Sequence, residues 1–126
     1  MSRAKQKGTV GENEIVALLE DHGIPNVHRN SASAESWDIR IGAMPMPIEV
    51  KFRQKWDLMA WIRKIRAVAS SDCWCEGGAE CRNTNEWAIF AIHGKRNTTA
   101  GREVGAVMVV DADFGAALLA HWVRES

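Results

Sequence analysis

The sequence has no run of about 18 apolar residues, which is the length that a membrane-spanning helix needs. Its first seven residues are Met-Ser-Arg-Ala-Lys-Gln-Lys, and no apolar segment follows them as it does in a secretory signal. Three cysteines in a chain without an export signal argue against a disulfide framework. These absences predict a soluble, cytoplasmic protein with no membrane partner.

A net charge is also absent, because 16 basic and 16 acidic side chains balance to +0. The charges are unevenly distributed, however. From Lys51 to Arg66 there are six basic residues and the single acid Asp57. A basic segment of this kind fits a phosphodiester substrate, although a solvated helix face explains the charge alone nearly as well.

At 126 residues the chain is long enough for one domain, residues 1–126, with a core of its own. Residues 1–10 show no apolar periodicity and are predicted to form a flexible basic arm. Residues 71–85 show neither helical nor strand periodicity and are predicted to form a long insertion loop.

The insertion loop contains Cys73, Cys75 and Cys81, which could ligate zinc with His28 or His93 as a fourth ligand. The Cys-x-Cys spacing is tighter than the usual gap in zinc sites, and no second pair follows it. The sequence therefore favours reduced thiols over a structural Zn²⁺ site.

Apolar periodicity predicts an α/β domain in the order α-β-β-β-α-β-β-α. Helices are expected at residues 11–22, at 57–70 and after a cap at 111 or 113; strands are expected at 26–30, 37–41, 48–52, 86–93 and 104–110. The last helix is predicted to cover the sheet with its apolar side chains, which are Phe114, Leu118, Leu119 and Trp122.

Two tryptophans lie near the start of the second predicted helix. Trp61 follows the apolar stripe of that helix and is predicted to be a core residue. Trp56 lies among basic residues at the helix start, so it is the better candidate for contact with nucleic acid. Packing against the protein explains Trp56 at least as well.

Asp38, Glu49 and Lys51 form the chemical centre of the sequence. Two short strands joined by a Pro-bearing turn would carry them, and strand alternation places Glu49 and Lys51 on the same face. Two carboxylates and an amine at the edge of a sheet suit the binding of a divalent cation and the activation of a water. Glu12 lies on the core-facing stripe of the first predicted helix, where a carboxylate needs a partner and a metal ion would provide one. The alternative is that Glu12 complements the helix dipole at the N-terminal end of the helix.

This set of residues resembles the PD-(D/E)xK nuclease superfamily, and within it the archaeal-type Holliday junction resolvases that also occur in phages. In that family a segment of basic residues and a glycine precedes a helix, and an acidic residue follows four positions after the glycine. Gly8 and Glu12 match these two positions. The strand-borne Asp matches Asp38, and the Glu-x-Lys matches Glu49-Val50-Lys51. Trp37 stands where the superfamily name puts Pro, and the likeness covers residues 3 to about 70.

The resemblance implies a restriction-endonuclease-like core, with a central mixed five-stranded sheet flanked by helices. It implies a Mg²⁺-dependent endonuclease, with Mn²⁺ as a substitute, that hydrolyses four-way DNA junctions as a homodimer in a prokaryotic or phage-infected cell. Glu12, Asp38, Glu49 and Lys51 would be catalytic, and the three carboxylates with the Val50 carbonyl would hold the metal. The expected DNA contacts are Arg3, Lys5, Lys7, Arg29, Ser31, Ser33, Arg53, Lys55, Arg63 and Lys64.

Two other functions remain open from the sequence. One is another PD-(D/E)xK nuclease, of the restriction type or acting at replication forks. The other is a catalytically silent DNA-binding module, against which the intact set of four site residues argues.

Overall fold

A computed structural model describes residues 3–30, 37–42, 44, 46–71, 86–94 and 105–126, and for residues 3–9, 70 and 71 it describes the backbone alone. Within these ranges the chain forms three helices and five strands. They are α1 (Arg3–Asp21), β1 (Val27–Arg29), β2 (Ile39–Ile41), β3 (Ile48–Arg53), α2 (Leu58–Ser71), β4 (Ala88–His93), β5 (Val107–Val110) and α3 (Ala112–Glu125).

The five strands form one sheet in the order β1-β2-β3-β4-β5. Strands β3 and β4 are parallel and are connected through α2, whereas the other neighbouring pairs are antiparallel. The predicted α/β class, the mixed five-stranded sheet and the order of the elements are therefore confirmed. No helix in the described ranges is long and apolar enough to cross a membrane.

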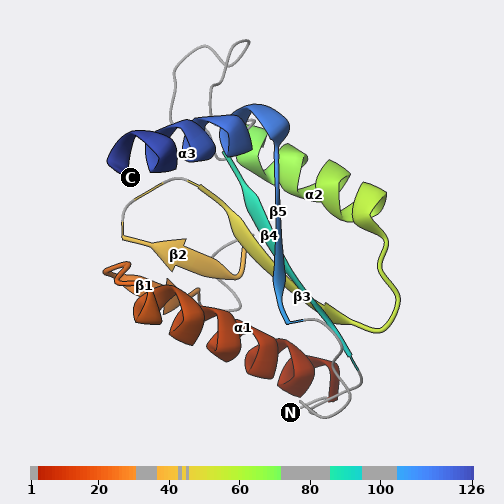
Figure 1. The fold of residues 1–126 in the computed structure, drawn as a ribbon. Helices are drawn as coiled ribbons and strands as arrows, with labels where there is room; N and C mark the ends of the chain where they lie inside the picture. Colours follow the sequence, from red (N-terminus) through yellow and green to blue (C-terminus); the bar gives the residue numbers. More distant parts are fainter. Residues whose placement is uncertain (1–2, 31–36, 43, 45, 72–85, 95–104) are drawn as a thin grey trace.

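The two faces of the sheet are covered by different helices (Figure 1). One face packs against Ile15 and Leu19 of α1. The other face packs against Ile65 and Ala69 of α2, where Ile89 of β4 is fully buried. Because side chains alternate along a strand, the two faces divide β3 between them. Ile48, Val50 and Phe52 belong to the core beneath α1, so Glu49 and Lys51 face the side that carries α2.

Gly11 explains how closely α1 approaches the sheet. A Cβ atom at this position would lie 3.3 Å from Val50 Cγ1 and 3.3 Å from Phe52 Cβ, which is tighter than ordinary packing. The missing side chain lets the helix backbone rest on β3. The next residue along the helix is Glu12, which is thereby brought to the sheet.

The start of α1 differs from the prediction. The helix begins at Arg3 rather than at Gly11, so residues 3–10 are its first turns and not a flexible arm. The residue types explain the difference, because Ala, Lys, Gln and Arg are good helix formers and need no apolar stripe to continue a helix. Gly8 and Gly11 lower this preference without ending the helix.

The prediction for α3 is wrong in its packing. Phe114 is partly buried, but Leu118, Leu119 and Trp122 are 42%, 64% and 67% exposed and do not cover the sheet. The helix follows directly on the edge strand β5, and its close approach is near its start, where a Cβ at Gly115 would lie 3.1 Å from Val110 Cγ2. The amphipathic pattern correctly indicated a helix, and Asp111 caps it by accepting from the Asp113 N–H at 2.9 Å.

Candidate functional site

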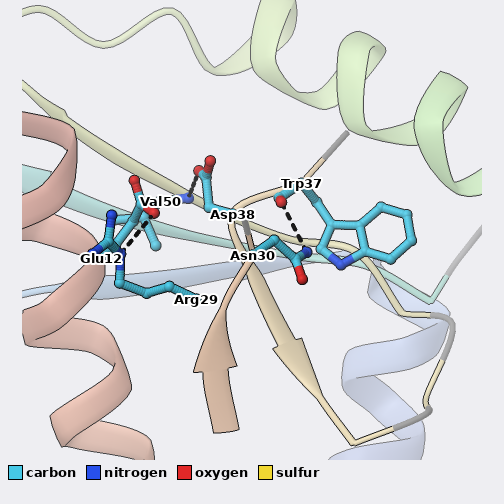
Figure 2. A network of polar contacts seen from close by, with 6 residues as sticks. All are labelled: Glu12, Arg29, Asn30, Trp37, Asp38 and Val50. Carbon is cyan, nitrogen blue, oxygen red and sulfur yellow. Dashed lines mark hydrogen bonds and ion pairs between the residues drawn. The ribbon is translucent and has the colours of Figure 1, made fainter. Parts of the chain in front are cut away.

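The candidate site lies where β2 and β3 separate. The pair Ile39 and Ile48 is in register, and the Asp38 N–H donates to the Ile48 carbonyl at 3.0 Å. Strand β2 begins at Ile39, so on the β2 side no strand residue lies across from Val50. The Val50 N–H donates instead to Asp38 Oδ2 at 2.8 Å (Figure 2). The Asp38 carboxylate thus takes the place of a backbone carbonyl at this opening of the sheet.

Glu49 is a charged residue in a buried position, with 7% of its surface exposed. Burial, the neighbouring Asp38 charge and a hydrogen bond with the Asp38 carboxyl together raise the pKa of Glu49 to about 8. The positive charges of Lys51 and Lys64 oppose this increase. Glu49 therefore holds its proton more tightly than an exposed glutamate does, and its carboxyl is hydrogen-bonded to Asp38.

Glu12 reaches the same region from α1. Its side chain is 16% exposed, and its Oε1 lies 3.2 Å from Arg29 Nε (Figure 2). Burial and then the Asp38 charge raise the pKa of Glu12, while the hydrogen bond and charge of Arg29 oppose the rise. Asp38 is thus the group that couples Glu12 to Glu49, because its charge raises the pKa of both.

The three carboxylates are chemically suited to a divalent cation, since hard cations take oxygen ligands and mutual repulsion would be relieved by the ion. In the described ranges, however, no three Asp, Glu, His or Cys side chains are arranged as a group that could hold a metal ion. Glu12 is instead paired with Arg29. The structure therefore brings the predicted carboxylates into electrostatic contact without forming a coordination sphere.

Lys51 and Lys64 supply the positive charge at the site. Lys51 is partly buried, and its Nζ lies 6.0 Å from the ring centroid of Trp61. Lys64 extends from the exposed side of α2, yet its charge also acts on Glu49. The sequence predicted Lys64 as a DNA contact only. Lys64 is three residues from Trp61, so the two side chains are neighbours along the helix surface. This spacing indicates a role at the site only once it is known that α2 crosses β3.

The segment before β2 is anchored by two residues that the sequence did not mark as functional. Asn30 Nδ2 donates to the Trp37 carbonyl at 3.0 Å (Figure 2). The Asn30 N–H donates to the Asp38 carbonyl at 2.9 Å. Trp37 is 4% exposed, and the guanidinium of Arg40 lies 5.6 Å from its ring centroid. Asp38 is therefore held on both sides of its Cα, which orients its carboxylate toward Val50.

The other predicted contacts are only partly located. Arg53, Lys55, Arg63 and Lys64 are exposed, as a DNA contact requires, whereas Arg29 is already paired with Glu12. Arg3, Lys5 and Lys7 lie on the first turns of α1. Ser31, Ser33 and the three cysteines lie outside the described residues, so the zinc prediction stays untested.

Comparisons with protein-family models, with curated proteins and with solved structures found no match to this chain.

Proposed function

We propose that this protein is a metal-dependent DNA endonuclease of the PD-(D/E)xK type that cuts branched DNA, in particular four-way junctions. One observation carries the proposal. Glu49 is a buried carboxyl that is hydrogen-bonded to Asp38 where the sheet opens, and Lys51 follows it on the same face of β3. Burial of the Glu49 carboxyl carries a desolvation cost in the folded chain, which favours a functional role for this side chain.

In the proposed reaction Asp38, Glu49, Glu12 and the Val50 carbonyl would hold Mg²⁺, for which Mn²⁺ would substitute. The bound cation would neutralise charge on the scissile phosphate and lower the pKa of the attacking water. Lys51 would orient that water or stabilise the charge that develops on the phosphate. Glu12 would have to leave Arg29 to join the other carboxylates, which frees the guanidinium to bind a neighbouring phosphate.

The choice of four-way junctions rests on the family resemblance and on symmetry. A symmetric junction requires paired cuts, so the proposed active form is a two-fold homodimer. Hydrolysis would leave a 5′-phosphate and a 3′-hydroxyl, as the resemblance implies. The exposed basic side chains Arg53, Lys55, Arg63 and Lys64 would grip the DNA backbone with little base specificity.

The test is cleavage of a synthetic four-way junction and of a linear duplex with the same sequences, in Mg²⁺. Glu49→Gln keeps the shape of the protonated side chain, so we expect a folded protein whose cutting falls by at least ~100-fold. Glu20→Gln, on the exposed side of α1, is the matched control and should cut at the wild-type rate. Light scattering during size-exclusion chromatography would test the homodimer.

Each outcome of this experiment has a distinct meaning. Wild-type cutting by the Glu49→Gln protein would remove the carboxylate pair from the site. Equal cutting of junction and linear duplex would favour another PD-(D/E)xK nuclease of the restriction or replication-fork type. Binding without cutting of any DNA in Mg²⁺ or Mn²⁺ would favour the silent DNA-binding module.

A further inference from the structure

Three aromatic rings gather beside the candidate site, at the end of β3 and β4. The ring centroids of Trp56 and Trp61 lie 6.2 Å apart with the ring planes tilted by 52°. Trp56 also meets His93 edge-on, with centroids 6.3 Å apart and an interplanar angle of 65°. We refer to Trp56, Trp61 and His93 as the aromatic cluster. It joins the loop after β3, the first turns of α2 and the end of β4.

Trp56 is the exposed member of the aromatic cluster, and it is held in place. Its exposed fraction is 37%, whereas Trp37 and Trp87 are 4% and 2% exposed and belong to the protein interior. Its Nε1–H donates to the Arg53 carbonyl at 3.2 Å. A ring that is exposed yet fixed by a hydrogen bond and two neighbouring rings loses little conformational freedom when a ligand stacks on it.

Lys51 links the aromatic cluster to the carboxylates. Its Nζ lies 6.0 Å from the Trp61 ring centroid, and its charge lowers the pKa of Glu49. One side chain therefore separates the rings from the site proposed for the scissile phosphate. Exposed Arg53 and Lys55 precede Trp56 in the sequence and add positive charge. Rings beside cations form a surface that matches a nucleotide, whose base stacks while its phosphate meets positive charge.

We propose that the aromatic cluster is a stacking subsite for an unpaired DNA base next to the phosphate held at Lys51. Within a continuous duplex each base is stacked on its neighbours, so a free base face exists only where a nucleotide is unpaired or turned outward. The subsite would thus favour DNA that carries an unpaired or turned-out nucleotide over plain duplex. This inference rests on the proposed nuclease function and adds the feature of the substrate that the protein recognises.

The test compares Trp56→Leu with Trp122→Leu, because leucine keeps apolar bulk and removes the stacking surface. Trp122 is 67% exposed on α3, whose C-terminal end lies on the opposite side of the molecule from the β3–α2 loop (Figure 1). Binding is measured in Ca²⁺ by anisotropy, for a duplex with one unpaired adenine and for the same duplex without it. Replacing that adenine by 2-aminopurine reports stacking through quenching of its fluorescence.

We expect Trp56→Leu to weaken binding of the bulged DNA about 5- to 100-fold and to abolish the quenching. Binding of plain duplex should change by less than about twofold, since phosphate contacts are retained. Trp122→Leu should change neither. Trp56→Phe should restore most of the binding, because phenylalanine still offers a ring face.

Equal weakening for both DNAs, unchanged binding of the bulged DNA, or quenching that survives in Trp56→Leu would each overturn the stacking subsite. Thermal unfolding of the variants identifies a misfolded protein, and Trp56→Phe then decides the question. The readout is binding and not cutting. If selective binding of bulged DNA persists in a protein that cuts no DNA, the stacking subsite stands and the nuclease proposal fails. If junctions are cut but Trp56→Leu does not change the binding of bulged DNA, the stacking subsite alone fails.

Discussion

Strand β3 has two neighbours, and its two borders are built differently. Toward β4 every residue from Ile48 to Arg53 has a partner in a parallel register, and the side chains on this border are almost all buried. Toward β2 the pairing holds at Ile39 and Ile48, and then the Asp38 carboxylate completes the hydrogen bonding. The polar site is thus located where backbone pairing ends, and the closed border keeps the strand in place.

The largest effect is expected on the closed border. Phe52 is 1% exposed and lies beneath Gly11, so Phe52→Ala removes packing that cannot be replaced. We expect a loss of about 3–5 kcal/mol in the free energy of unfolding, measured by urea titration. Met59→Ala is the control, because Met59 is 62% exposed and should change stability by less than about 0.5 kcal/mol. A loss below about 1 kcal/mol for Phe52→Ala would contradict the described core.

The open border predicts a change of opposite sign for Glu49→Gln. In the folded chain the pKa of Glu49 is about 8, against an ordinary value of 4.5. Between these pH values the folded chain keeps a proton that the unfolded chain has lost, so stability without metal falls as pH rises from 4.5 through 8. Glutamine carries no charge to bury. Glu49→Gln should therefore be about 1–3 kcal/mol more stable than the wild type at pH 8.

The measurement for Glu49→Gln is urea unfolding in a chelator across this pH range, with Glu20→Gln as the control. The advantage of Glu49→Gln should shrink toward pH 5, where wild-type Glu49 is protonated in the folded state. Adding Mg²⁺ should stabilise the wild type at pH 8 and leave Glu49→Gln nearly unchanged. A variant that is less stable than the wild type at every pH would show that the carboxylate is needed for folding.

Gly11 tests how α1 is positioned against β3. A methyl group there would gain about 1 kcal/mol of helix propensity but would press on Val50 and Phe52 at 3.3 Å. We expect Gly11→Ala to lose about 1 kcal/mol overall, seen as a lower melting temperature. Asn13→Ala, at an exposed position of the same helix, should be neutral or slightly stabilising. A more stable Gly11→Ala would mean that α1 can move away from the sheet at no cost.

The smallest effect is expected for Arg29→Met. The Arg29 side chain is 38% exposed, and ion pairs with this much solvent contribute little to stability. The change in the free energy of unfolding should stay below about 1 kcal/mol in a thermal melt. A loss well above this value would make the Glu12–Arg29 pair a structural element, and Glu12 would then be hard to release toward a metal.

Strand alternation was enough to predict part of the site from the sequence. The run Ile48-Glu49-Val50-Lys51-Phe52 places Glu49 and Lys51 opposite the apolar residues, and the structure buries the apolar face beneath α1. Trp61, predicted to be a core residue, is partly buried and packs against the cluster beneath α2. These features follow from local periodicity, which a sequence displays directly.

The features that the sequence did not predict depend on contacts between distant segments. Gly11 looked like a helix start, although it is a point of close approach to β3. The stripe on α3 indicated an apolar face but not which surface, if any, it would meet. The influence of Lys64 on Glu49 depends on how α2 crosses the sheet, and no local pattern encodes that crossing.

The hydrogen bond between Asp38 and the Val50 N–H affects which residues would be kept in related proteins that have lost activity. Removing the Asp38 carboxylate would leave that N–H without its acceptor, at a cost of about 1–3 kcal/mol. Under the proposed nuclease function, a descendant that no longer cuts DNA could exchange Lys51, but it would still be under selection to keep an acceptor at position 38. Retention of Asp38 in such a lineage would therefore indicate only that the sheet is intact, and Lys51 would be the better indicator of catalytic activity.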